Sequence, residues 1–193
     1  MRKAWFLTVA LVGLLEIPVP ANELTNSDLS NRLDFWHGDG FIVFLNPDGS
    51  EGQEGDGTVT PVIKINLTNE PHFVYQELRT ISSSNILTVK VDIMPSSNFK
   101  RSDIDHDYNR NWSVEGTWYK HGGPLAIPAV DFWIRCSNGA KEWAYRLANI
   151  TAGQWTTVIG RFMGMRPIEG REIYFCVPTG EGSIYLKNFS VEP

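Results

Sequence analysis

The chain has 193 residues, of which 42% are hydrophobic and 20% are charged, and its formal net charge at pH 7 is −5. The apolar fraction excludes an intrinsically disordered protein, and the acidic balance excludes a protein held to nucleic acid by a basic surface. Seven tryptophans are many for an acidic chain of this length, and tryptophan commonly serves either packing or a flat ligand.

The first 21 residues have the pattern of a secretory signal peptide. A short basic start precedes an apolar run from Ala4 to Leu15, and small residues lead up to Ala21. The run is shorter than the ~18–20 residues of a membrane span. We therefore expect cleavage after Ala21, no membrane span, and a secreted protein that acts extracellularly, in a periplasm or at a cell surface. Residues 22–193 are expected to form one domain.

Short alternating runs separated by Gly, Pro, Asn and Asp occupy the rest of the chain, and no sustained helical period is present. This pattern predicts an all-β protein, a two-sheet antiparallel β-sandwich of the jelly-roll type. The predicted strands are Phe41–Leu45, Thr58–Ile65, Phe73–Arg79, Ile86–Met94, Val130–Cys136, Glu142–Leu147, Thr156–Phe162, Ile173–Val177 and Ile184–Val191.

The stretch from Pro95 to Pro128 has no strand pattern, and loops of this length are usually functional or disordered. It is too aromatic for simple disorder. Its rings either bind a ligand or anchor the loop onto the sandwich. The candidate ligand-binding residues of this loop are Tyr108, Trp112, Trp118 and Tyr119.

The same loop contains the one catalytic-looking run, in which Asp103, Asp105 and Asp107 point the same way on an extended chain. The run resembles the Glu-x-Asp-x-Glu strand of jelly-roll endoglucanases and laminarinases, where one carboxylate is the nucleophile and another the acid/base. A solvated acidic loop and a divalent metal site are the alternatives. No serine-nucleophile elbow or zinc-binding histidine spacing accompanies the run, so a non-catalytic protein is favoured.

The dipeptide Asn138-Gly139 predicts a hairpin with a two-residue type I′ turn. The predicted pairs are Arg135 with Glu142, Ile134 with Trp143, Trp133 with Ala144, Phe132 with Tyr145 and Asp131 with Arg146. In this register Trp133 lies on a polar face between two ion pairs, and Trp143 lies on the core face. The alternative for Trp133 is a ring that merely lies over a solvated sheet face and is covered at its edge by the long loop.

Cys136 and Cys176 both lie in apolar strand-like runs. Export would permit a disulfide between them, and two buried thiols are the alternative.

Several segments together resemble the carbohydrate-binding modules of the CenC type, families 4, 9, 16 and 22, which have a galactose-binding-like jelly roll. The opening residues 24–29 followed by Trp36 are similar to the start of these modules. The strand of residues 73–78 is similar to a family strand that ends in a glutamine, here Gln76. Gly153-Gln154-Trp155 and the closing segment 184–191 also look like family strands.

The resemblance implies that an oligosaccharide lies across one sheet face or along a loop rim. An aromatic plane flanked by polar side chains suits a sugar ring. The expected ligand-binding residues are Trp133, Asp131, Arg135, Glu142, Arg146 and Gln76, together with the aromatic residues of the long loop. For Gln76 the alternation leaves open which face of its strand points inward. Trp36, Trp143 and Trp155 are expected in the core.

The family often holds a structural calcium ion between the two chain ends. Here Asn26, Asp28 and Asn188 could supply oxygens to such an ion, whereas Lys187 stands where the family often has an aspartate. No other cofactor is expected.

The sequence therefore predicts a secreted, non-catalytic protein that binds a poly- or oligosaccharide, with a glycoside hydrolase or a surface assembly as its partner. Two alternatives remain open: a small jelly-roll glycoside hydrolase or polysaccharide lyase that uses the three aspartates, and an envelope or adhesion protein that binds another protein.

Overall fold

The computed structural model describes residues 22, 24–70, 72–79, 84–101, 131–136, 141–143, 145–147, 151–163, 170–177 and 179–193, and for residues 101, 131–136, 141–143, 145–147 and 170 it describes the backbone alone. These residues form antiparallel strands. No helix long and apolar enough to cross a membrane is found in this part of the chain.

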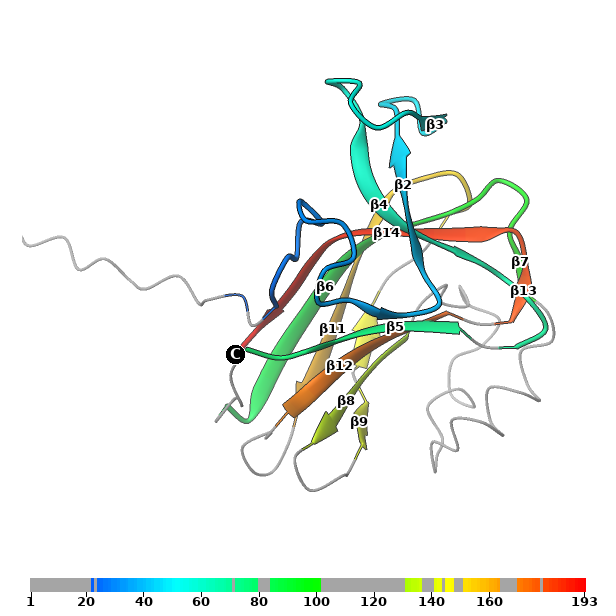
Figure 1. Ribbon diagram of the computed structural model, residues 1–193. Coiled ribbons are helices and arrows are strands. Elements are labelled where there is room, and N and C mark those ends of the chain that lie inside the picture. Colours follow the sequence, from blue (N-terminus) through cyan, green and yellow to red (C-terminus); the bar gives the residue numbers. More distant parts are fainter. Residues whose placement is uncertain are drawn as a thin grey trace, which may run out of the picture.

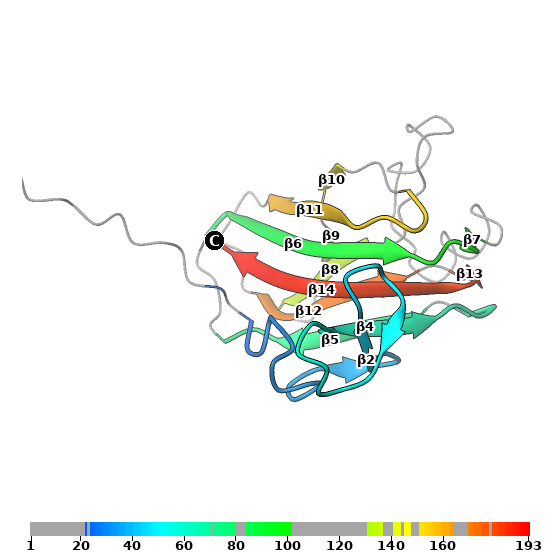
Figure 2. The same cartoon turned by 90° about the horizontal axis from the view of Figure 1, so that it is seen from above.

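Two sheets make up the fold, with strand orders β1-β5-β12-β8-β9 and β10-β11-β6-β14-β4-β2-β3, and β13 pairs with β7 in a small third sheet. Figure 1 shows β5, β12, β8 and β9 side by side, and Figure 2 shows β11, β6 and β14 running together in the other sheet. The strands are β1 (His37–Gly38), β2 (Phe41–Leu45), β3 (Glu51–Gly52), β4 (Thr60–Asn66), β5 (His72–Glu77), β6 (Ile86–Pro95), β7 (Lys100–Arg101), β8 (Asp131–Cys136), β9 (Lys141–Trp143), β10 (Tyr145–Leu147), β11 (Thr156–Met163), β12 (Gly170–Val177), β13 (Gly180–Glu181) and β14 (Ser183–Glu192).

Strict alternation builds the central strands of the larger sheet. In β6 the side chains of Leu87, Val89, Val91 and Ile93 are fully buried, while the three residues between them are only partly buried. Strand β14 keeps its apolar residues inward through a bulge, because its pairing with β6 shifts between Lys187 and Ser190. The buried positions of β14 therefore have even residue numbers before the bulge and odd residue numbers after it, so that Phe189 is buried.

The core lies between the two sheets, where apolar residues of both inner faces meet. Trp36 caps this core from the N-terminal segment: its ring centroid lies 4.3 Å from that of Phe189 and 5.8 Å from that of Phe175. The side-chain amide of Asn22 also ties the first described residue to β14, because it donates to the Phe189 carbonyl and accepts from the Val191 amide. The two ends of the described chain therefore lie together, as Figure 1 shows.

The predicted fold class is confirmed, and each of the nine predicted runs contains at least one strand. The run from Glu142 to Leu147 differs from the prediction, because it supplies two strands to two sheets: β9 pairs with β8, and β10 pairs with β11. Its alternation could not reveal this division, since a chain that passes between the sheets of a sandwich can stay extended on both sides of the crossing.

The disulfide considered for Cys136 and Cys176 is excluded by the register. Cys176 pairs with Asp131, whereas Cys136 pairs with Gly170 at the other end of the same ladder. Five residues of strand separate the two positions, which corresponds to roughly 17 Å. A disulfide requires Cα atoms within about 7 Å of each other.

The outer face of the larger sheet carries a second, smaller apolar cluster. Leu45, Val62 and Met94 are buried there, and Trp155 and Tyr185 pack against them. Trp155 is half-buried in this cluster, and the Lys187 Nζ lies 4.1 Å from its ring centroid. The expectation that Trp155 belongs to the main core is therefore wrong, because its side chain is on the opposite side of the sheet.

Lys64 and Glu51 form an ion pair on this outer face, with 2.6 Å between Nζ and Oε1. The hydrogen bond from Lys64 lowers the pKa of the Glu51 carboxyl below its usual 4.5. A carboxyl whose pKa is lower in the folded state stabilises the fold above its unfolded pKa, and this contribution is lost as the pH falls.

We expect Glu51→Gln to reduce the loss of stability between about pH 5 and pH 3, because the variant has no carboxylate to protonate there. The effect should stay well below about 1 kcal/mol, since nearly half of the Glu51 side chain is exposed to screening solvent. Urea unfolding at several pH values measures it. An unchanged pH dependence in the variant would show that the pair contributes no stability.

Candidate functional site

The two faces of the smaller sheet differ in character. Val74 and Gln76 of β5, with Ile173, Phe175 and Val177 of β12, are buried against the core. The intervening residues face away from the core, because successive side chains of a strand alternate between faces. This outer face therefore carries a different set of side chains, which begins with Tyr75 and Tyr174.

An unbroken row of aromatic residues crosses the outer face from one edge of the sheet to the other. Each member is the direct pairing partner of the next, so that all five positions share one face. At ~4.8 Å between strands, the row spans about 19 Å. We call it the aromatic row; from β1 to β9 its members are His37, Tyr75, Tyr174, Trp133 and Trp143.

The rings at the β1 side of the row contact one another. Tyr75 and Tyr174 are stacked with their centroids 4.6 Å apart and their planes at 14°, and the His37 ring lies 5.1 Å from Tyr75. Phe73, which is partly exposed, meets the edge of Tyr174 at 5.9 Å. Tyr174 is buried, with 5% of its surface exposed, and its hydroxyl donates to Glu172 Oε2 at 3.0 Å.

Charged residues run parallel to the aromatic row, two positions along each strand. Glu77 pairs with Glu172, Glu172 with Arg135, and Arg135 with Lys141. Acidic and basic residues thus occupy the positions next to the aromatic row. Aromatic rings beside charged residues suit a ligand that has a flat apolar face and a rim of hydroxyl groups, because the ring face stacks and the rim forms hydrogen bonds.

Glycine permits the edge strand β1 to join this sheet. Gly38 has φ +114°, and a Cβ atom there would lie 2.1 Å from the Phe73 carbonyl oxygen. Any other residue would push β1 away from β5, and His37 would leave the aromatic row with it.

The predicted register of the β8–β9 hairpin is wrong by one residue. Trp133 pairs with Trp143, and Glu142 pairs with Ile134. In the structure five residues lie between Arg135 and its partner Lys141. A two-residue turn at Asn138-Gly139 would pair Arg135 with Glu142 instead, with six residues between them. Because a slip of one residue reverses every face, Trp143 joins Trp133 on the outer face and Glu142 leaves it.

The predicted hairpin paired Arg146 with Asp131, and this prediction is wrong. It lies in β10 of the larger sheet and pairs with Gly160, while Asp131 pairs with Cys176. Of the residues predicted to surround Trp133, the register therefore keeps Asp131 and Arg135 on its face, and it removes Glu142 and Arg146.

Gln76 is buried, and its side chain is used by the protein itself. Its Oε1 accepts from the Thr25 amide and its Nε2 donates to the Thr25 carbonyl, each at 2.7 Å. The face left open by the sequence is thus settled, with Gln76 inward and not on the outer sheet face. Instead, Gln76 fixes the N-terminal segment to the end of β5.

The residues proposed for a structural calcium ion make other contacts. The Asn188 side-chain amide donates to Asp92 Oδ2 at 2.7 Å. The Asn26 amide donates to the carbonyls of Arg32 and Asp34 and accepts from the Asn31 amide, so it closes its own loop. Asp28 is exposed, and the hydrogen bond from the Ser30 amide lowers its pKa. Calcium needs six to eight oxygens, and no cluster of three acidic, histidine or cysteine side chains occurs among the described residues.

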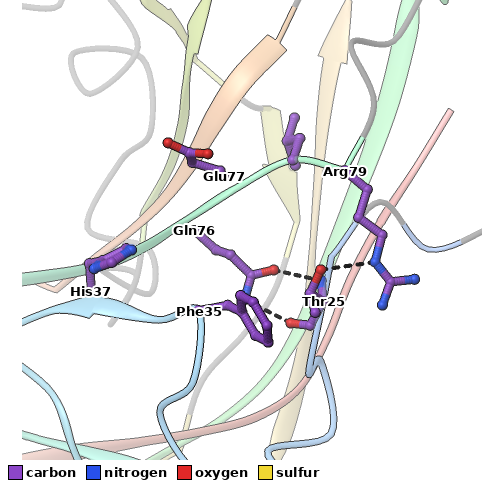
Figure 3. Close-up of a pocket in the computed structure, with 7 residues that line it drawn as sticks. Thr25, Phe35, His37, Gln76, Glu77 and Arg79 are labelled. Atoms are coloured by element: carbon purple, nitrogen blue, oxygen red, sulfur yellow. Dashed lines mark hydrogen bonds between the residues drawn. The ribbon is translucent and has the colours of Figure 1, made fainter.

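A pocket of about 230 Å³ adjoins the aromatic row at its β1 end. Its wall combines the end of β5 with the N-terminal segment, as shown in Figure 3. His37 belongs to both the pocket and the row. The lining residues are Thr25, Phe35, His37, Gln76, Glu77, Leu78 and Arg79.

The remaining predicted site residues lie outside the described part of the chain. They are Tyr108, Trp112, Trp118 and Tyr119, and the alternative catalytic residues Asp103, Asp105 and Asp107. Conversely, the structure adds site residues that the sequence analysis missed: Tyr75, Tyr174, Glu172 and His37. The alternation of Tyr75 and Glu77 with Val74 and Gln76 indicates that the two pairs lie on opposite faces of the strand. The pattern alone does not tell which pair faces inward.

No protein-family profile and no curated protein matches the sequence. Solved structures match the fold. TmCBM61, solved in complex with β-1,4-galactotriose, aligns with 89% of this chain and 97% of its own chain at 12% identity and a TM-score of 0.51. The CBM22-1–CBM22-2 tandem domain of Xyn10C from Paenibacillus barcinonensis aligns with 90% of this chain and 46% of its own, at 10% identity and a TM-score of 0.50. The chain thus has the jelly-roll β-sandwich fold of carbohydrate-binding modules.

Proposed function

We propose that this protein is a non-catalytic carbohydrate-binding protein that holds a poly- or oligosaccharide along the aromatic row. The observation that carries the proposal is the register, which aligns five aromatic positions across the outer face of one sheet. His37 is exposed and Tyr75 is half-buried, whereas Tyr174 between the two halves of the row is buried. Sugar rings present a C–H face that stacks on aromatic planes and hydroxyl groups that pair with bordering charged side chains. The jelly-roll fold that the chain shares with carbohydrate-binding modules supports the proposal.

The length of the row supports a chain of several sugar units rather than a single monosaccharide. A ligand spread over ~19 Å engages several rings at once, so the weak stacking energies add along the chain. We further propose that the protein acts after export, because residues 1–21 have the signal-peptide pattern. Its proposed partner is a glycoside hydrolase or a surface assembly.

Affinity electrophoresis on a panel of neutral and acidic polysaccharides tests the function. We expect at least one polysaccharide to retard the protein and Trp133→Ala to abolish most of the retardation. Reducing-sugar release from the same panel tests for catalysis and is expected to be absent. A panel on which no polysaccharide retards the protein would contradict the proposal, and sugar release that Asp105→Asn abolishes would favour an enzyme.

A further inference from the structure

The pocket beside the aromatic row has a fixed floor. Thr25 and Gln76 satisfy each other through two hydrogen bonds of 2.7 Å, and the Arg79 Nε donates to the Thr25 hydroxyl at 2.9 Å. Figure 3 shows Thr25 between Phe35 and Arg79, with the amide of Gln76 directed at it. Because these groups already pair with one another, the pocket is formed before any ligand arrives.

Two groups around this floor are available to a ligand. The Phe35 side chain is 60% exposed, which is unusual for a large apolar residue. The terminal nitrogens of Arg79 make no ion pair or hydrogen bond with the described residues, although the Nε bond to Thr25 holds the guanidinium in place. An arginine anchored in this way presents its fork of N–H donors, which matches a carboxylate in a bidentate manner.

The size of the pocket limits what enters it. Its volume of about 230 Å³ lies below the ~300–1,000 Å³ of pockets that hold a drug-sized ligand, so it accepts one sugar unit or a smaller group. His37 lies in both the pocket wall and the aromatic row, so a glycan on the row would place its next unit here. The pocket is therefore an end position of the proposed binding face.

We infer that the pocket binds a single uronic acid at the end of the glycan, with the carboxylate on Arg79 and the sugar ring against Phe35. The inference rests on the proposed function and adds a class of ligand to it. One acidic unit fits better than a polyanion, because the Glu77 carboxylate also lines the pocket and the protein has a net charge of −5. A long acidic chain would be repelled by that charge, whereas one carboxylate is matched by one guanidinium.

The experiment compares two ligands that differ only at their end. One is a neutral oligosaccharide that the protein binds, and the other is the same oligosaccharide oxidised at the terminal C6 hydroxyl to a uronic acid. Calorimetric titration is expected to give about tenfold tighter binding of the acid, the effect of one charge-assisted arginine–carboxylate pair. Arg79→Gln should abolish this preference, and raised salt should weaken it. The matched control is Arg161→Gln, an exposed arginine of β11 in the other sheet, which should keep the preference.

Equal affinity for the two ligands in the unaltered protein, or a preference that survives in Arg79→Gln, would overturn the inference. If no neutral oligosaccharide binds at all, the proposed binding face fails, and the pocket is then tested alone. Free glucuronate, with glucose as the control, should shift the amide resonances of Thr25, Gln76 and Arg79. If glucuronate has no effect beyond that of glucose, the pocket assignment fails as well.

Discussion

Replacing Trp36 by alanine is expected to lower the free energy of unfolding by about 3–5 kcal/mol, the usual cost of removing a buried aromatic side chain. The ring is 6% exposed and packs on Phe175 and Phe189, and its Nε1 donates to the Asn26 carbonyl at 3.1 Å. The substitution therefore leaves a cavity and also releases the N-terminal segment that carries Phe35 and His37. Chemical denaturation monitored by circular dichroism measures the change.

Trp36→Phe separates packing from the hydrogen bond. Phenylalanine keeps most of the ring contacts and loses only the Nε1 donor, so the expected cost is about 1–3 kcal/mol. A Trp36→Ala variant as stable as the unaltered protein would show that the N-terminal segment does not pack on the core as described.

Replacing Trp143 by alanine is expected to weaken glycan binding by roughly 10- to 30-fold, or about 1.4–2 kcal/mol, while changing stability little. The reason is its pairing with Trp133, which places it on the outer face. The register predicted from the Asn-Gly turn would instead put Trp143 in the core, where alanine would destabilise the fold. Titration calorimetry together with denaturation distinguishes the two registers.

Trp155→Ala is the matched control, because Trp155 lies on the outer face of the other sheet under Lys187. The same substitution there should leave glycan affinity unchanged. Loss of stability in Trp143→Ala with unchanged affinity would show that Trp143 lies in the core. The aromatic row would then end at Trp133.

The sequence was sufficient for the fold class, because alternation and turn residues act locally. In β6 the apolar residues from Leu87 to Ile93 alternate with less buried ones, so the strand could be predicted from its own pattern. The bulge in β14, where the inward positions shift by one residue, could not be predicted in this way. The candidate site was harder to predict, since it depends on which strands pair and in what register. The Asn-Gly signal was a correct indication of a hairpin near residue 138 but gave the wrong register, and a single residue of slip exchanged Trp143 for Glu142.

Long-range pairing accounts for the other differences. Tyr75 and Tyr174 meet because β5 and β12 are neighbours although about a hundred residues separate them, and no local pattern specifies such a pair. Gln76 was open for a similar reason, since its partner Thr25 lies 51 positions away in the sequence. Sequence patterns thus predicted which residues form strands, whereas the tertiary pairing determines which side chains share the outer face.

Amide chemical-shift mapping with a retarding oligosaccharide tests the central claim most directly, because it reports which sheet the ligand covers. We expect the largest shifts at Tyr75 and Tyr174 and along β8 and β9, with little change at Tyr185 and Trp155 on the other sheet. Shifts confined to the strands β2, β4 and β14 would contradict the account, since the glycan would then lie on the sheet that lacks the aromatic row.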